Sequence, residues 1–113
     1  MKKWAVAWMV LVLGTTAALA GSKWTTVGTL TAGGSAKEVG VNRSIETVQI
    51  ECTDGTVIVN TVVIREGAAK TPITVAQRFN AGDKRDLAVG GKRNVTGLRI
   101  SDGGRGSYTI RVK

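Results

Sequence analysis

The sequence predicts an all-β protein, an antiparallel β-sandwich of the jelly-roll or immunoglobulin-like type with about seven or eight short strands. Three observations indicate this fold class. Apolar and polar residues alternate along much of the chain, and Val, Ile and Thr, which suit a half-buried pleated surface, are frequent. Glycine-rich turns recur at intervals of about 8–12 residues. The chain has one Pro and no convincing amphipathic helix.

The first part of the chain has the pattern of a secretory signal peptide. Lys2 and Lys3 precede an apolar run over 5–13, and the small-residue site Ala18-Leu19-Ala20 predicts cleavage after Ala20. Retention as a membrane anchor is the alternative, but a spanning helix needs about 20 apolar residues and this run is about half as long. We therefore expect a cleaved signal peptide over 1–20 and a single β-sandwich domain over 21–113, periplasmic or secreted by a bacterium.

Four strands are expected in the first half of the domain. Val48, Ile50 and Cys52 alternate with polar residues, which indicates a strand with one buried face. The stretch 56–65 is apolar on both faces, which indicates either a central strand or a local irregularity at Asn60. Between these two stretches, Asp54-Gly55 predicts a tight hairpin. The four predicted strands are Lys23–Leu30, Lys37–Val41, Ile45–Cys52 and Thr56–Arg65.

Four more strands are expected in the second half. Pro72 stands near the start of its strand, where a missing N–H does least damage to the sheet. In the last strand Tyr108 and Ile110 alternate with Arg111, so that one face is apolar. The four predicted strands are Thr71–Phe79, Arg85–Val89, Arg93–Ser101 and Ser107–Lys113.

Composition excludes several chemistries. Without His, and with Cys52 as the single cysteine, the chain has no Ser-His-Asp or Cys-His catalysis and no usual zinc site. Cys52 is expected in the core as a small hydrophobe. Asp54, Asp83 and Asp102 stand beside Gly in turns, where Asp bonds its own backbone. We expect no enzyme activity, catalytic residue, metal or cofactor. A small carboxylate-dependent hydrolase stays as the alternative.

Basic residues outnumber acidic ones by 16 to 8, which favours anionic partners. Nucleic acid is not expected, because Trp24, Phe79 and Tyr108 fit core positions and leave no stacking platform. If the last strands are neighbours, their basic residues share one solvent face, where Arg suits phosphate and carboxylate groups. A merely solvated face is the alternative. The candidate anion-binding residues are Arg78, Lys84, Arg85, Lys92, Arg93, Arg99 and Arg111.

One segment carries a resemblance to a known pattern. The run Phe79-Asn80-Ala81-Gly82-Asp83-Lys84-Arg85-Asp86-Leu87, followed by Gly90-Gly91-Lys92-Arg93, resembles an uncharacterised family of small exported bacterial proteins, a domain of unknown function. That pattern has a Trp near the mature start, F-x-A-G-x-x-R-x-L, G-G-x-R and a closing aromatic-rich strand. The resemblance implies an exported β-sandwich and no known activity. The matching residues are Trp24, Phe79, Gly82, Arg85, Leu87, Gly90, Gly91, Arg93 and Tyr108.

These observations together predict an exported, non-catalytic binding or accessory module. Its expected partner is an anionic glycan, a lipid head group or a protein, and we do not expect it to span a membrane after signal cleavage. Besides the hydrolase, a second alternative to this binding module is a structural subunit that assembles through edge strands. The ligand, the strand order and the oligomeric state do not follow from the sequence.

Overall fold

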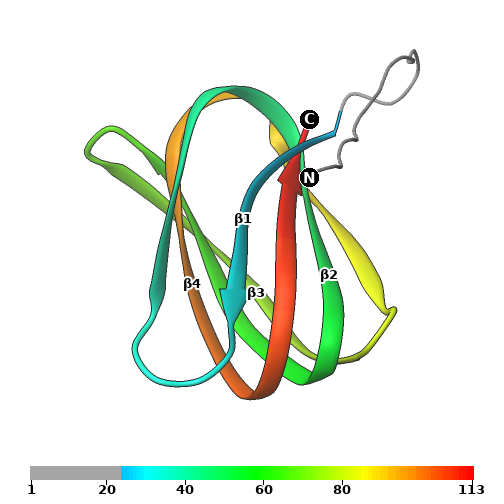
Figure 1. Ribbon diagram of the computed structural model, residues 1–113. Coiled ribbons are helices and arrows are strands. Elements are labelled where there is room, and N and C mark those ends of the chain that lie inside the picture. The colour runs from blue at the N-terminus through cyan, green and yellow to red at the C-terminus, as the bar shows by residue number, and fades with distance from the viewer. Residues whose placement is uncertain (1–23) are drawn as a thin grey trace, which may run out of the picture.

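The computed structural model describes residues 24–113 (Figure 1), and both the predicted signal peptide and its cleavage site lie outside these residues. The described chain is all-β, which confirms the predicted class. It forms four strands: β1 (Thr25–Thr31), β2 (Lys37–Glu66), β3 (Ala69–Asn80) and β4 (Lys84–Val112). All pairs are antiparallel, and the strands lie side by side in one sheet in the order β1-β4-β2-β3.

The number of strands differs from the prediction of seven or eight. β2 takes up three of the predicted strands and β4 takes up three more, because backbone pairing continues around the bends that we expected to interrupt it. Residues with positive φ allow these bends, such as Asn42 at 50° and Gly55 at 65°. The predicted Asp54-Gly55 hairpin is wrong, because Gly55 pairs with Gly106 across the sheet and the flanking segments of β2 do not pair with each other.

β2 and β4 pair along three stretches: 37–45 with 93–100, 47–51 with 84–88, and 48–65 with 97–112. Residues 37–40 of β2 pair with 97–100 of β4, and residues 61–65 of β2 pair with the other side of that same stretch. Residues 47–51 of β2 lie between 84–88 and 109–112, both from β4. Because 93–101 and 107–112 pair with different partners, the last two predicted strands are not neighbours.

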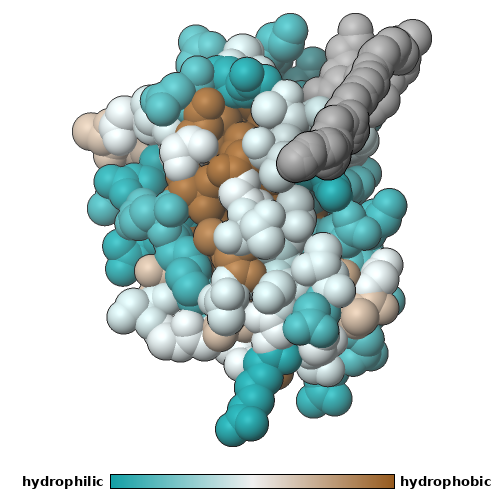
Figure 2. Space-filling model, in the orientation of Figure 1, coloured by the Kyte–Doolittle hydropathy of each residue, from teal (hydrophilic) through white to brown (hydrophobic). Residues whose placement is uncertain are grey.

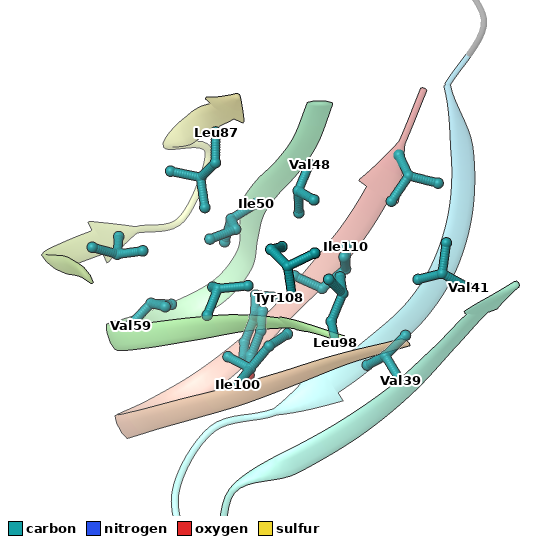
Figure 3. Close-up of a cluster of buried hydrophobic side chains, with 14 of the residues drawn as sticks. Val39, Val41, Val48, Ile50, Val59, Leu87, Leu98, Ile100, Tyr108 and Ile110 are labelled. Atoms are coloured by element: carbon teal, nitrogen blue, oxygen red, sulfur yellow. The ribbon is translucent and has the colours of Figure 1, made fainter. Parts of the chain in front are cut away.

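A continuous apolar core fills the space that the bent sheet encloses (Figure 3). Tyr108, Phe79 and Cys52 have no exposed surface, as predicted from the alternation in their strands. Central placement of residues 56–65 is also confirmed, because this part of β2 lies between β4 and β3. Residues 24–113 contain no helix of the length and apolarity that crossing a membrane requires.

Candidate functional site

The seven candidate anion-binding residues do not gather on one face. Arg99 lies opposite Glu38 and Val63, whereas Arg111 lies opposite Thr26 and Gln49 in a different part of the sheet. The prediction that these residues share one solvent face depends on the last two predicted strands being neighbours, and the pairing of β4 contradicts this condition. Anion binding by these residues stays a prediction.

Two of the seven form ion pairs with glutamates, Arg99 in an exposed pair and Arg111 in a half-buried one. The Arg99 guanidinium lies 3.0 Å from a Glu38 carboxylate oxygen, and Arg65 contacts the other oxygen of Glu38 at 2.7 Å. Arg111 lies 2.5 Å from Glu51, and its hydrogen bond holds the pKa of Glu51 below the ordinary value, against the opposing effect of burial. These arginines balance acidic side chains on the sheet surface.

Two more arginines hold parts of the fold together. Arg85 donates to the Gln77 side chain at 2.9 Å and to the Val75 carbonyl at 3.3 Å, and so joins the start of β4 to β3. Arg93 donates to the Val89 carbonyl at 2.7 Å and pairs with Glu66 at 2.9 Å. Arg85 and Arg93 are both among the residues that match the family pattern described above, and these contacts give both of them a structural role.

The remaining three, Arg78, Lys84 and Lys92, are exposed. Within residues 24–113 none of them forms an ion pair. Arg78 lies on β3, and the two lysines lie at separate points of β4. They are free to attract anions but do not form a shared site.

A better site is a depression of about 310 Å³ that the sequence analysis did not single out. It lies where the register between β2 and β4 shifts, between the pairs Gly40–Gly97 and Arg43–Val95. Two short tripeptides far apart in the sequence, 42–44 and 94–96, lie side by side here with the same Asn-x-Ser/Thr pattern. The lining residues are Asn42, Arg43, Asn94, Val95 and Thr96.

Two of the lining side chains are held by hydrogen bonds. Arg43 donates from Nη1 to the Thr25 hydroxyl at 2.8 Å, which ties the wall of the depression to the start of β1. Thr96 donates to the Arg65 carbonyl at 3.0 Å and accepts from the Gly67 N–H at 3.1 Å. The Arg43 guanidinium has further N–H donors, and within residues 24–113 it forms no ion pair.

The lining combines one cation with neutral groups that donate and accept hydrogen bonds. Asn42 and Asn94 are exposed and carry amides, Val95 forms an apolar floor with 1% exposure, and no carboxylate lines the depression. Such a surface suits a ligand that has one negative group and several hydroxyls.

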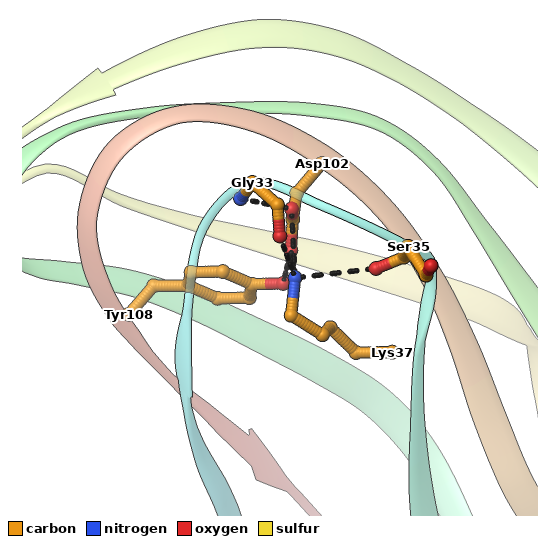
Figure 4. Close-up of polar contacts among 5 residues, drawn as sticks. All are labelled: Gly33, Ser35, Lys37, Asp102 and Tyr108. Atoms are coloured by element: carbon orange, nitrogen blue, oxygen red, sulfur yellow. Dashed lines mark hydrogen bonds and ion pairs between the residues drawn. The ribbon is translucent and has the colours of Figure 1, made fainter.

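A second polar cluster is buried and lies elsewhere (Figure 4). The Asp102 carboxylate has no exposed side-chain surface and accepts hydrogen bonds from the Gly33 N–H at 2.8 Å, from Lys37 Nζ at 3.1 Å and from the Tyr108 hydroxyl. Burial, reinforced by this hydrogen bond, raises the pKa of Tyr108 far above its ordinary value. The cluster fastens the β1–β2 loop to β4. Asp102 therefore does more than close its own turn.

Metal binding finds no support in this part of the molecule. No group of three or more His, Cys, Asp or Glu side chains in residues 24–113 is placed to hold a metal ion. Asp83 has the local role predicted for it, since its carboxylate accepts from the Asn80 N–H at 2.9 Å.

Comparison with known proteins finds no match for this chain among family models, curated proteins or solved structures. The resemblance to the uncharacterised exported family stays a prediction.

Proposed function

We propose that this protein is an exported, non-catalytic binding module that binds an acidic glycan of the cell envelope in the depression around Arg43. One observation carries the proposal: Arg43 stands among hydrogen-bonding neutral side chains in an open depression whose lining has no carboxylate. A guanidinium in such a setting pairs with a carboxylate or phosphate through charge-assisted hydrogen bonds.

The size and chemistry of the depression support a sugar ligand. About 310 Å³ is at the lower end of the range for small-molecule sites, enough for one or two sugar rings. The amides of Asn42 and Asn94 complement ring hydroxyls, because each amide both donates and accepts. The excess of basic over acidic residues attracts acidic polymers over a longer range.

The carboxylate-dependent hydrolase is less well supported. Such an enzyme needs a carboxylic acid whose pKa is raised, so that it stays protonated near neutral pH. The pKa of Glu51 is instead lowered by Arg111, and Asp102 is enclosed by Lys37 and Tyr108. These carboxylates have structural partners in place of a substrate.

We also propose that the bent sheet is a jelly-roll sandwich. The register supports two groups of neighbouring segments, one with 25–31, 107–112, 47–52 and 84–88, the other with 37–40, 97–101, 61–66 and 69–74. Each group has the antiparallel neighbour relations of one layer of a two-layer jelly roll. The bends within β2 and β4 would then be the corners where the chain passes between layers.

The binding proposal is tested with defined probes. Protein expressed from the full-length sequence is applied to a carboxylated polysaccharide such as polygalacturonate, to phosphatidylglycerol vesicles and to neutral dextran, at low and physiological salt. We expect binding to the carboxylated polysaccharide that persists at physiological salt. Arg43→Gln removes a charge-assisted hydrogen bond and should weaken it at least about tenfold.

The matched control is Arg78→Gln, which removes the same charge from an exposed position on β3 and should change binding less than about twofold. Because Arg43 also bonds Thr25, the melting temperature of both variants is measured alongside. Equal losses in the two variants, binding that vanishes at physiological salt, or no binding to the polysaccharide would refute the proposal. Retention on the vesicles alone would assign the site to a lipid head group.

A further inference from the structure

β3 and β1, the strands at the two ends of the order β1-β4-β2-β3, differ in how they resist the addition of another strand. β3, at one edge, carries Lys70, Pro72 and Arg78, and its Ala76 has a positive φ of 48° beside a register shift in its pairing with β2. Charges, proline and irregular backbone all discourage a second chain from pairing with an edge. This edge is protected.

β1, at the other end of the strand order, lacks the charges and the proline, although its own pairing with β4 shifts register between Thr26 and Gly28. Thr25–Thr31 contains no charged residue and no Pro. One side of this strand pairs with β4, from Thr25 opposite Val112 to Thr31 opposite Ser107, and within residues 24–113 no strand pairs with its other side. That side therefore presents backbone N–H and C=O groups without ladder partners, which is a template for strand addition.

An apolar strip lies beside this open edge. Figure 2 shows it on the face over which β1 runs in Figure 1, and Figure 3 shows Val39 and Val41 on the segment of β2 alongside β1. These two valines keep 7% and 8% exposure, and Leu30 of β1 is only partly buried against the core. Gly28 of β1 lies next to Val39 but has no side chain to cover it. A Cβ at position 28 would lie 3.5 Å from Val39 Cγ1, in van der Waals contact.

We propose that a second copy of this chain adds its β1 to this edge, antiparallel and related by a two-fold axis. The same short strand supplies both halves of the contact: unpaired backbone groups and the inward side chain of Leu30, which would cover the strip of the other copy. Two copies of a chain in which basic residues outnumber acidic ones repel each other, and β1 adds nothing to this repulsion because the strand carries no charge.

The outward face of the joined strands is also compatible. Thr29 and Thr31 are exposed, and a two-fold axis near Leu30 places Thr29 opposite Thr31 of the partner subunit. Threonine pairs across antiparallel strands are favourable. No residue of β1 lines the depression, although Arg43 bonds Thr25 at the start of β1, and each proposal is tested with variants of its own, so the two can fail independently.

Sedimentation equilibrium tests the proposal. Protein expressed from the full-length sequence, its N-terminus determined by mass spectrometry, is measured from about 10 µM to about 1 mM, a range that covers weak association. We expect wild-type protein to approach twice the monomer mass. Thr29→Lys or Thr29→Glu alone should lower the association constant at least about tenfold, because the two like charges then lie on the diagonal across the axis, within reach of each other.

An equimolar mixture of Thr29→Lys and Thr29→Glu should associate again, since opposite charges then meet. Thr74→Lys places the same charge on an exposed residue of β3 and should stay within about twofold of wild type. A wild-type protein that stays monomeric to about 1 mM overturns the proposal. So does an equal loss in the β1 and β3 variants, or a mixture that fails to associate.

Discussion

Removal of the buried Asp102 carboxylate should be one of the most damaging single changes to this fold. Asp102→Ala leaves three donors without their acceptor: the Gly33 N–H, the Lys37 ammonium and the Tyr108 hydroxyl. Tyr108 has no exposed surface, so its hydroxyl cannot turn to water. An unsatisfied buried polar group costs about 1–3 kcal/mol.

The contribution of Lys37 is limited by its surroundings. Its side chain keeps 23% exposure, and Nζ also donates to the Gly33 carbonyl at 2.7 Å. The ammonium therefore retains a partner and reaches solvent after the carboxylate is removed. Breaking a buried ion pair typically costs about 3–5 kcal/mol, and this exposure favours the lower part of that range. We expect Asp102→Ala to reduce the free energy of unfolding by about 3–4 kcal/mol.

Urea unfolding followed by circular dichroism measures this loss, against a total stability of about 5–15 kcal/mol for a typical domain. Asp86→Ala is the control, because Asp86 is an exposed carboxylate that accepts from Gln49 at 3.0 Å; its loss should cost less than about 1 kcal/mol. A loss below about 1 kcal/mol for Asp102→Ala, or equal losses in the two variants, would show that the buried cluster does not stabilise the fold.

Three further outcomes follow from the same contacts. The raised pKa of Tyr108 means that this tyrosine ionises at lower pH in the unfolded chain than in the folded one. The stability that the protonated hydroxyl contributes is therefore complete below about pH 10 and is lost as pH rises further. In urea titrations, Tyr108→Phe should make the free energy of unfolding fall less at alkaline pH than it does in the wild type. The lowered pKa of Glu51 has the opposite sign, so its contribution is present above pH 4.5 and is lost as pH falls through the folded pKa; Glu51→Gln should flatten the acid side of the stability profile. Ala76→Gly should raise the free energy of unfolding by up to about 1 kcal/mol, because glycine adopts the positive φ of 48° without strain, and an unchanged or lower urea midpoint would contradict this.

Local alternation in the sequence was a reliable guide to burial. It correctly assigned Cys52, Phe79 and Tyr108 to the core, whereas Trp24, also expected there, is only half-buried. Successive side chains of a strand point to opposite faces, so burial needs only the local pattern and no knowledge of which strands are neighbours. The apolar run over 56–65 likewise indicated a central strand, and the structure places this segment between β4 and β3.

Local turn chemistry was a less reliable guide. Asp54-Gly55 has the composition of a hairpin turn, yet the chain continues through it as part of β2, paired with β4. Asp102 also resembles a turn residue beside glycines, but its carboxylate is buried against Lys37 and Tyr108. In both cases a distant segment supplies the partner, and a short sequence window does not contain that partner.

The sequence by itself determined the all-β class, the buried side chains and the excess of positive charge, because each depends on composition or on neighbours along the chain. Only the tertiary structure decided which of those charges lie together. It separated Arg99 from Arg111, gave Arg85 and Arg93 internal partners, and brought Arg43 beside Asn94. The physical reason is that strand pairing depends on how β2 and β4 bend and meet across long distances in sequence, and this long-range register sets the surface chemistry.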